Sequence, residues 1–489
     1  MLNKMPDETS VSALLITLHF TIVALTLLRV MLRPHREPAA RLAWIAIITA
    51  LPIAGVLCYL FFGEVSIGNK SVKKMQHVLD KIATLDAPLN VAVEGRDNLI
   101  PVGFEQVFKL SRSINGFPAV AGNRAVLLAD SGAVNTALIA DIDGAKDHVH
   151  LLFYIWLPDN SGRKVVEALK RAAGRGVQCR VMVDSLGSSA LVRSPHWAAM
   201  KNIGVSLAVI LPIGNPVLRI VFGRIDLRNH RKIVVIDGRI TYCGSQNCAD
   251  PEFLVKAKFA PWVDVVLRVE GAVAQQNQSL FISDWMVWAN EDISSPYLSV
   301  PPQCVDSALV AQAFGTGPTS RAMAMSQMFV ALLTSALEEL TITTPYFIPN
   351  EAIQSALQAA AHRGVKVSLI LPANNDSWLV QRASRSYYLE LLAAGVVIYE
   401  YSPGLLHAKT LTIDGQCLML GSANLDRRSF DLNYENNMLL FDEDIVSDVL
   451  ARQQEYIQQS HRITFNTVKA WSVSSRLVDN TLAVLGPVL

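Results

Sequence analysis

The sequence predicts an α/β protein with two tandem domains of similar plan, preceded by two transmembrane helices. Three observations predict it: two uncharged apolar runs near the amino terminus, a twofold alternation of strands and helices, and a histidine-containing string that ends each pass. A chain of 489 residues is too long for one ordinary core. Its 51% hydrophobic and 17% charged residues make it more apolar than a typical soluble protein. Part of it is expected to meet lipid.

Residues 1–70 are predicted to form a membrane anchor. The runs 9–28 and 42–63 contain no ionised side chain, and each is long enough to cross a bilayer as a helix. Pro52 stands in the middle of the second run, where its missing N–H is expected to bend the helix. Two crossings would place the amino terminus and everything after residue 63 on the same side of the membrane.

A buried helical hairpin of a soluble domain is the alternative for these runs. Trp44 and Tyr59 disfavour it, because aromatic residues of this kind gather at membrane interfaces. The flanking charges leave the orientation undecided, since the rule that basic loops stay inside gives nearly equal counts. On the side of the connecting loop stand Arg29, Arg33, Arg36 and Arg41, and on the other side Lys4, Lys70, Lys73, Lys74 and Lys81.

Charge and cysteine content exclude several classes of protein. Lys and Arg number 43 and Asp and Glu 42, a net charge of +1, so no global positive field exists to attract nucleic acid. The six cysteines are scattered and lack the paired spacing of a zinc site or disulfide framework. We expect no nucleic-acid partner, no metal and no other cofactor.

After a connecting region at 71–119, a pattern of strands and helices runs twice through the chain. We assign the first domain to 120–300 and the second to 301–463, followed by a tail at 464–489. Both passes read as strand, helix, an Arg-Gly-Val turn and strand, which favours two domains of one design. The matched segments are 150–156, 165–173 and 179–184 in the first pass, and 340–347, 352–361 and 367–371 in the second.

Each pass ends in the same unusual string, His-x-Lys-x4-Asp followed seven residues later by Gly-Ser-x-Asn. Two copies with identical tails are not expected by chance. The candidate catalytic residues are His230, Lys232, Asp237, His407, Lys409 and Asp414, and the tails add Ser245, Asn247, Ser422 and Asn424.

The spacing within the string points to phosphate chemistry. Residues at i and i+2 of a strand share a face, so each imidazole and ammonium would point together. Joined halves would place two imidazoles, two ammonium groups and two amides around one point, a phosphate-sized site without a metal. Asp237 and Asp414 stand at an odd offset from their histidines. They are expected to face away from the phosphate and brace the fold.

These motifs resemble the phospholipase D superfamily, and nearly the whole chain resembles its bacterial cardiolipin synthases. Further matching strings follow the first and second copies. They are Trp262-x-Asp264-x-x-x-Arg268-Val-Glu-Gly, Leu425-Asp-x-Arg-Ser429 and Asn433-Tyr-Glu435. The resemblance implies two phospholipase D-like domains, each a mixed sheet flanked by helices, related by pseudo-twofold symmetry.

The resemblance also implies a reaction. One phosphatidylglycerol loses glycerol to form a phosphatidyl-histidine, and a hydroxyl of a second phosphatidylglycerol opens it to give cardiolipin. By analogy alone, His230 is expected to be the nucleophile and His407 the acid and then the base. Asp264 and Glu435 would orient the histidines. The lysines and asparagines would stabilise the phosphate oxygens, with Ser245 and Ser422 as helpers.

The expected partners are phosphatidylglycerol and membrane lipid, and the expected location is the bacterial inner membrane as a multi-pass protein. Self-association is left open. The alternatives are a hydrolytic phospholipase D, another phosphatidyltransferase, a nuclease of the superfamily and a non-catalytic lipid-binding scaffold. Two further stretches could rest on lipid or on the protein: the apolar segment 210–222 and a weakly amphipathic helix at 470–485 within the tail.

Overall fold

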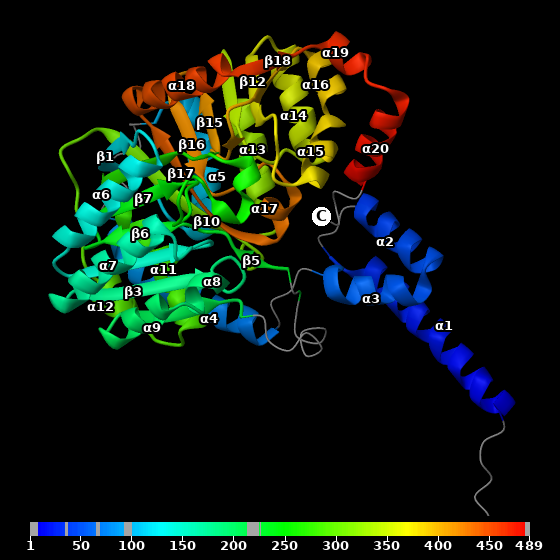
Figure 1. The fold of residues 1–489 in the computed structure, drawn as a ribbon, viewed down its shortest axis with the longest axis horizontal. Coiled ribbons are helices and arrows are strands. Elements are labelled where there is room, and N and C mark those ends of the chain that lie inside the picture. Colours follow the sequence, from blue (N-terminus) through cyan, green and yellow to red (C-terminus); the bar gives the residue numbers. More distant parts are fainter. Residues whose placement is uncertain are drawn as a thin grey trace, which may run out of the picture. The chain divides into compact units, whose positions relative to one another are not determined.

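The computed structural model describes residues 8–34, 38–64, 69–91, 100–212, 224 and 226–484. The chain divides into a small amino-terminal unit, which contains the helices between residues 8 and 64, and a large unit of residues 69–212 and 227–484 (Figure 1).

The amino-terminal unit contains three helices. Helix α1 spans Glu8–Leu32, and its stretch Ser12–Leu32 is long and apolar enough to cross a membrane. The second expected span is divided into α2, Pro38–Ala50, and α3, Pro52–Phe62. Each is too short to cross by itself. In the described residues the structure therefore supports one spanning helix, and the expected second crossing is not confirmed.

The division falls at Leu51 and Pro52. Proline cannot donate a backbone hydrogen bond, and Leu51 leaves the helical region with φ −132° and ψ 72°. The chain then doubles back, so that the rings of Trp44 on α2 and Tyr59 on α3 lie 5.3 Å apart. Val30 of α1 belongs to the same buried cluster. The bend expected at Pro52 is thus a reversal of direction that makes a helical hairpin.

Within the described part of the large unit, 16 strands form one sheet. They are β1 Val120–Leu127, β2 His148–Phe153, β3 Gln178–Asp184, β4 Ser206–Ile210, β5 Arg228–Asn229, β6 Ile233–Ile236, β7 Ile240–Gly244, β9 Val266–Gly271, β10 Leu309–Thr316, β11 Glu339–Thr343, β12 Lys366–Pro372, β13 Val397–Tyr401, β15 Thr410–Ile413, β16 Cys417–Gly421, β17 Asn433–Phe441 and β18 Ser460–Ile463. A separate pair joins β8 Trp262–Val263 to β14 Leu405–Leu406.

The strand order shows that the two repeats share one topology. From one edge it runs β18-β13-β12-β11-β15-β16-β17-β10, and it continues through β1-β9-β7-β6-β2-β3-β4 to the other. Apart from β18, each strand of one half has an equivalent in the other. The halves meet where β1 pairs antiparallel with β10. Parallel pairs (β2 with β3, β11 with β12) and antiparallel pairs (β2 with β6, β11 with β15) make the sheet mixed, as expected.

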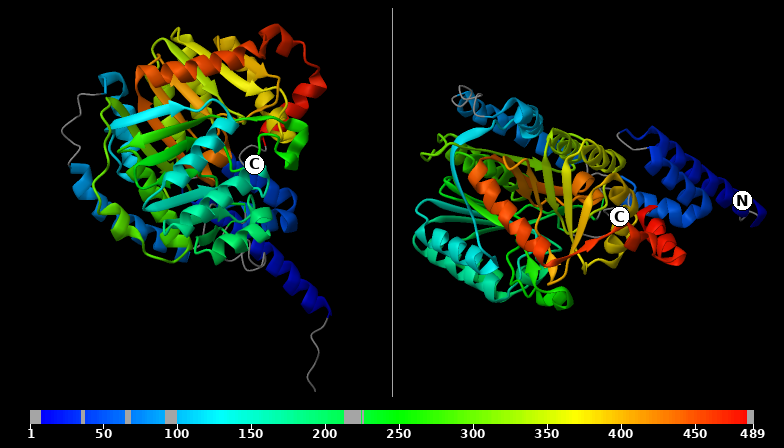
Figure 2. Two further views of the ribbon diagram at one scale, coloured as in Figure 1. Left: turned by 60° about the vertical axis from the view of Figure 1, so that its left-hand side comes forward. Right: turned by 90° about the horizontal axis from the view of Figure 1, so that it is seen from above.

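Helices pack on both faces of this sheet (Figures 1 and 2). The described helices of the large unit, including those that pack on other helices, are α4 Asn69–Val91, α5 Val102–Asn115, α6 Ser131–Gly144, α7 Asn160–Gly174, α8 Ser189–Val192, α9 Pro195–Asn202, the 3-10 helix η2 Leu254–Phe259, α11 Ala274–Trp288, α12 Ser294–Leu298, α13 Ala324–Ser335, α14 Glu351–His362, α15 Trp378–Arg385, α16 Tyr388–Ala394, α17 Arg427–Asp431, α18 Glu443–Gln458, α19 Phe465–Lys469 and α20 Val473–Val484.

Strand β16 shows how one element serves both faces. Cys417 and Met419 join the core formed with α13 and α14, whereas Leu418 and Leu420 join the core formed with α18. Alternate residues of a strand point to opposite faces, so this uninterrupted apolar run predicts a strand that is covered on both sides.

The Arg-Gly-Val turns recognised in the sequence end equivalent helices. Asp159 caps α7 by accepting the Gly162 N–H, and Asn350 caps α14 by accepting the Ile353 N–H. At the other ends, Gly176 and Gly364 have φ values of 91° and 93°, a conformation that favours glycine. The turns then feed β3 and β12 at matching places in the two repeats.

The tail forms α19 and α20. Asp479 of α20 is buried and forms ion pairs with Arg382 and Arg385 of α15, at 2.7 and 3.8 Å. Leu477 and Val484 on the same helix are 66% and 70% exposed. The tail helix therefore rests on the protein with one face and leaves an apolar face open. Most of the apolar segment 210–222 lies outside the described residues.

Candidate active site

Each of the two motif histidines is attached to a strand of the other repeat. The His230 N–H donates to the Tyr434 carbonyl at 2.9 Å, following the parallel pairing of β5 with β17. The His407 N–H donates to the Val263 carbonyl at 2.8 Å, following the pairing of β14 with β8. The backbone thereby brings each histidine beside a carboxylate that stands next to its partner strand residue.

Both histidine side chains make the same contact. Nδ1 of His230 lies 2.9 Å from Oε2 of Glu435, and Nδ1 of His407 lies 2.6 Å from Oδ1 of Asp264. All four residues are buried or nearly so. With Nδ1–H donated to a carboxylate, the lone pair is on Nε2, where an imidazole can attack or accept a proton. We infer this tautomer from the partner atoms.

The two carboxylates are themselves held by donors from the tail motifs. Ser245 donates to Asp264 at 2.6 Å, and Ser422 donates to Glu435. Glu435 also accepts from Ser429 at 2.9 Å and from the Asn433 amide at 3.2 Å. The serine hydroxyls, expected as phosphate helpers, thus contact the histidine partners, and these contacts favour an orienting role.

The two lysines lie in the same buried site. Lys232 Nζ donates to the His230 carbonyl at 2.8 Å, and Lys409 Nζ donates to the His407 carbonyl at 2.6 Å. Neither histidine–lysine pair lies within a regular strand, because β6 begins at Ile233 and β15 at Thr410. The expected shared strand face is replaced by a short extended segment before each strand, and the lysine turns back to its own histidine.

Burial weakens the charged state of the basic groups. It lowers the pKa of Lys232 to about 8, against the opposing effect of Glu435. It lowers the pKa of Lys409 to about 7, where Asp264 opposes the change and the charge of Lys232 adds to it. The lysines therefore act on one another electrostatically. An anionic phosphate placed between them would favour the ammonium forms.

Burial also holds both imidazoles neutral. It lowers the pKa of His230 to about 4, with Glu435 opposing and Lys232 contributing. It lowers the pKa of His407 as well, with Lys409 contributing and Asp264 opposing. Burial by itself would raise the pKa of Asp264, but His407 and Lys409 bring it down to about 2. The site therefore combines neutral imidazoles with ionised carboxylates at neutral pH.

The residues beside His230 are fixed by a second network. The Asn229 amide donates to Asp284 of α11 at 3.0 Å, and Arg231 donates to the same carboxylate at 2.8 Å. The Asn229 N–H donates to Asp184 of β3 at 3.1 Å. The residues beside His407, Leu406 and Ala408, are buried and apolar. The two halves of the site are therefore not equivalent.

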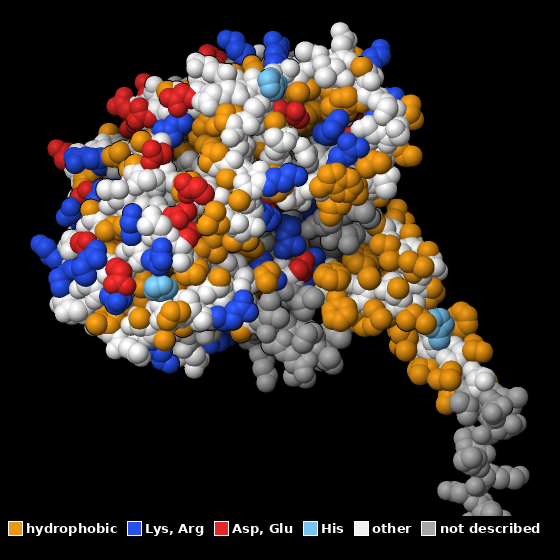
Figure 3. Space-filling view, in the orientation of Figure 1, with side chains coloured by type: hydrophobic (Ala, Val, Ile, Leu, Met, Phe, Trp, Pro, Cys, Tyr) orange, Lys and Arg blue, Asp and Glu red, His pale blue; other side chains and the backbone are white. Residues whose placement is uncertain are grey.

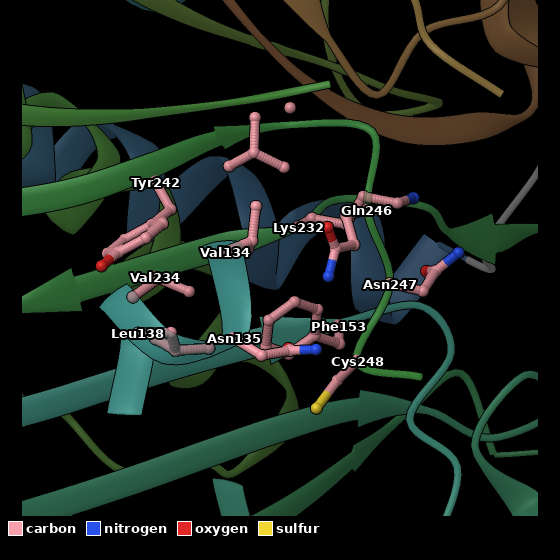
Figure 4. Close-up of a pocket in the computed structure, with 12 residues that line it drawn as sticks. Val134, Asn135, Leu138, Phe153, Lys232, Val234, Tyr242, Gln246, Asn247 and Cys248 are labelled. Carbon is pink, nitrogen blue, oxygen red and sulfur yellow. The ribbon is translucent and has the colours of Figure 1, made fainter. Parts of the chain in front are cut away.

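The tail asparagines lie on the site but make different contacts. Asn247 accepts the Ile155 N–H at 3.2 Å. Asn424 is buried, and its Oδ1 has no hydrogen-bond partner among the described residues. Beside Lys232 and Asn247 lies a cavity of about 30 Å³, which is large enough to hold water. Figure 4 shows Lys232, Gln246 and Asn247 on one side of this cavity. Apolar side chains, among them Leu138 and Val234, lie on the other side.

The motif aspartates lie at the far ends of their strands. Asp237 accepts N–H groups of Lys146, Asp147 and His148, which precede or begin β2. Asp414 accepts N–H groups of Leu337, Glu338 and Glu339 at the start of β11, at 2.8–2.9 Å. Both carboxylates thus hold the backbone at the start of a neighbouring strand.

Two aromatic side chains, which the sequence did not assign to the site, contact the catalytic histidines. The Tyr154 ring lies 5.0 Å from the His230 ring, with Lys232 Nζ 5.7 Å from its centroid. The Trp262 ring lies 4.7 Å from the His407 ring. Tyr154 lies in the strand predicted at 150–156, and Trp262 lies in a string that matches the family. Asp284 carried no such signal.

Among the described residues, no cluster of three or more His, Cys, Asp or Glu side chains is placed to hold a metal ion. The charged groups that converge here are Lys232, Lys409, Asp264 and Glu435. Together with His230 and His407, these groups can bind a phosphodiester. One histidine can attack phosphorus through Nε2, and the other can supply a proton through its own Nε2.

Comparison with known proteins agrees with this chemistry. The family model for "Cardiolipin synthase, PLD-like domain" matches residues 138–285 and 329–457. The model for "Phospholipase_D-nuclease N-terminal" matches residues 21–64. Cardiolipin synthase A of Escherichia fergusonii is 37% identical, over 92% of this chain and 93% of its own. Cardiolipin synthase A of Citrobacter koseri is 36% identical, over 98% of this chain and 99% of its own.

A solved structure shares the fold. The phosphatidylserine synthase of Haemophilus influenzae matches with a TM-score of 0.58 and 13% identity, covering 78% of this chain and 100% of its own. The duplicated sheet and paired His-x-Lys motifs define a phospholipase D-type enzyme. Over nearly its full length the chain belongs to the family of PLD-like cardiolipin synthases. Such enzymes are phosphatidyltransferases.

Proposed function

We propose that this chain joins two phosphatidylglycerol molecules into cardiolipin and glycerol through a phosphatidyl-histidine intermediate. The reciprocal pairing of His230 with Glu435 and of His407 with Asp264 carries the proposal, since it presents two Nε2 atoms to one buried site. Similarity to cardiolipin synthases over nearly the whole chain supports the choice of substrate.

The first step forms the covalent bond. His230 Nε2 attacks phosphorus of the first phosphatidylglycerol, and the bond from phosphorus to the headgroup glycerol oxygen breaks. His407 takes up a proton at Nε2 when the anionic lipid binds, because a nearby negative charge favours an imidazolium. The leaving glycerol oxygen takes that proton, so glycerol leaves neutral and His407 becomes a neutral base. Lys232 and Lys409 balance the charge on the non-bridging oxygens, which is greatest in the transition state. Asn247 and Asn424 are positioned to add amide contacts.

The second step releases product. A hydroxyl of a second phosphatidylglycerol gives its proton to His407 and attacks phosphorus, and the bond from phosphorus to His230 Nε2 breaks. The site then returns to its starting protonation state. One base serves both steps in opposite directions, as microscopic reversibility requires.

The unequal support of the two histidines favours this assignment of roles. Among the described residues, Glu435 accepts from four donors, His230, Ser422, Ser429 and Asn433. Asp264 accepts from His407 and Ser245. The negative charge of Asp264 is divided among fewer donors, so it stabilises an imidazolium at His407 more effectively. The more fixed His230 suits the nucleophile.

Access for lipid is supported near His407. The Trp262 ring, in contact with His407, lies 4.1 Å from the Phe253 ring. The next residues, Leu254 and Val255 at the start of η2, are 76% and 67% exposed. An exposed apolar surface thus lies next to the aromatic rings of the site, which suits a lipid substrate. We place the enzyme in the bacterial inner membrane, held by α1.

The test is an assay of purified enzyme with radiolabelled phosphatidylglycerol, with and without EDTA, followed by separation of cardiolipin, phosphatidic acid and glycerol. We expect cardiolipin and glycerol in equal amounts, little phosphatidic acid and no effect of EDTA. Phosphatidic acid as the main product would assign a hydrolytic phospholipase D instead. No turnover in a folded enzyme would assign a lipid-binding scaffold.

Single substitutions test the intermediate. His230→Ala and His407→Ala should each lower turnover by at least about 10³-fold, because the roles cannot be exchanged. The surface variant His362→Ala is the matched control and should retain full activity. Acid quench should leave label on His230 of the wild type. Label on His407 would reverse the assignment and preserve the mechanism.

A further inference from the structure

The end of the α2–α3 hairpin returns to the end of α1. Glu64 follows α3, and its Oε2 lies 2.8 Å from Nη2 of Arg29 and 3.5 Å from Nη1 of Arg33. Arg41, near the start of α2, donates to the Arg33 carbonyl at 2.9 Å. The chain therefore enters α2 and leaves α3 at the level where α1 ends.

The hairpin is too short to cross a bilayer. Helix α2 has 13 residues and α3 has 11, so at about 1.5 Å per residue they reach about 20 Å and about 17 Å into a core about 30 Å thick. The hairpin packs against Val23, Leu27 and Val30, in the carboxyl-terminal half of α1. The short length of the hairpin and its place beside only the second half of α1 both indicate that it enters one leaflet.

The outer surface of the hairpin suits lipid. Its exposed large side chains are apolar, and Figure 3 shows hydrophobic atoms covering the visible face of this unit. They are Leu42, Leu51, Ile53, Leu57 and Leu60, between 45% and 70% exposed.

The backbone at the bend is also suited to a membrane interior. Leu51 N–H donates to the Ile47 carbonyl at 2.9 Å, and Gly55 N–H donates to the Leu51 carbonyl. Pro52 has no N–H to satisfy. Thr49 donates its hydroxyl to the Ile45 carbonyl at 2.6 Å. The reversal therefore keeps the N–H groups of Leu51 and Gly55 paired, which lowers the cost of placing it in hydrocarbon.

We propose that α2 and α3 form a re-entrant hairpin that enters and leaves the bilayer on one face, so that the chain crosses the membrane once, through α1. The amino terminus and the catalytic unit then lie on opposite sides. The occupant of the exposed hairpin surface is the lipid of one leaflet. This replaces the two crossings expected from the apolar runs.

A single crossing also decides the orientation that the charges left open. The basic residues of the loop and those after the hairpin now stand on the same side, against Lys4 on the other. They are Arg29, Arg33, Arg36, Arg41, Lys70, Lys73, Lys74 and Lys81. Basic flanks remain in the cytoplasm. The catalytic unit is therefore cytoplasmic and the amino terminus is outside.

Cysteine labelling in spheroplasts tests the topology. Cys304 of the catalytic unit is exposed and serves as one reporter. The other is Asn3→Cys in a chain that also carries Cys58→Ser and Cys304→Ser. A membrane-impermeant maleimide should label Asn3→Cys in intact spheroplasts and Cys304 only after permeabilisation. Labelling of both cysteines from the same side would show that the chain crosses the membrane twice and would overturn the proposal. The reverse pattern would overturn the cytoplasmic assignment.

Cross-linking tests the hairpin itself. In one continuous helix, residues 44 and 59 would lie about 22 Å apart along the axis, whereas the Trp44 and Tyr59 rings are 5.3 Å apart here. In a Cys58→Ser background, Trp44→Cys with Tyr59→Cys should therefore cross-link with a short bifunctional reagent. Leu42→Cys with Leu57→Cys has the same separation in sequence, but both side chains face outward.

The control pair should cross-link at least 10-fold less. Failure of the first pair, with both thiols still open to alkylation in detergent, would overturn the hairpin. Neither experiment depends on catalytic activity, so their outcome is separate from that of the proposed reaction.

Discussion

Asp264 lies in the first repeat, yet its Oδ1 lies 2.6 Å from Nδ1 of His407 in the second. The reverse contact joins Glu435 of the second repeat to His230 of the first, at 2.9 Å. Each repeat thus supplies a histidine to one pair and a carboxylate to the other. Neither repeat can form a complete site without its partner, which explains why both copies of the motif are intact.

Removing the charge of either carboxylate should impair catalysis without unfolding the enzyme. Asp264→Asn and Glu435→Gln keep the shape but no longer favour the Nδ1–H tautomer or stabilise an imidazolium. We expect turnover to fall on the order of 10²- to 10⁴-fold with a nearly unchanged KM. Steady-state kinetics beside a thermal melt measures this. A rise in KM with unchanged kcat would show that the carboxylates act in substrate binding.

Asp414 should matter for stability more than for chemistry. Its carboxylate accepts three backbone N–H groups at the start of β11, and their loss in Asp414→Ala should lower the free energy of unfolding by about 2–4 kcal/mol. Activity per folded molecule should stay within about threefold of wild type.

Denaturant unfolding and active-site titration measure both quantities for Asp414→Ala. Asp444→Ala, an exposed residue on α18, is the control and should change neither. A stable Asp414→Ala enzyme without activity would give the motif aspartate a chemical role.

Activity should depend on pH in a bell-shaped manner. Below about pH 4 His230 becomes protonated and cannot attack, because its pKa is about 4. Above about pH 7 Lys409 loses its proton, since its pKa is about 7, and the phosphate loses a positive partner. The alkaline limb of kcat should lie higher than that of kcat/KM, because bound phosphate stabilises the ammonium.

Lys409→Arg identifies the group behind the alkaline limb. A guanidinium stays charged throughout the accessible range, so this limb should move upward by more than one pH unit in whatever activity remains. An unmoved limb would assign it to His407.

Removing residues 1–68 should impair access of the enzyme to lipid in a bilayer but leave the catalytic reaction intact. All residues with a proposed chemical role lie in the large unit, so the truncated chain should turn over detergent-dispersed phosphatidylglycerol within about tenfold of the full chain. On bilayers its rate should fall much further, because the anchor concentrates the enzyme at its substrate. A truncated chain that unfolds cooperatively yet remains inactive on dispersed lipid would show that the anchor helps to build the site.

Local sequence patterns were sufficient to predict the fold class and most residues of the site. The His-x-Lys-x4-Asp strings, their Gly-Ser-x-Asn tails and the repeated alternation of strands and helices depend on spacing within a few residues. They therefore predict two α/β repeats and the composition of the site. Asp237 and Asp414 were expected to face away from the phosphate, and in the structure each accepts backbone N–H groups at the start of a neighbouring strand.

Only the tertiary structure decided how these parts combine. The attachment of His230 to β17 and of His407 to β8 joins residues 143 to 205 positions apart. The support of Asn229 and Arg231 by Asp284 likewise arises from packing. At the amino terminus, an apolar run of spanning length folds back at Leu51 and Pro52, and Glu64 then contacts Arg29 of α1. Hydropathy counts residues along the chain, whereas such contacts depend on which segments meet in space.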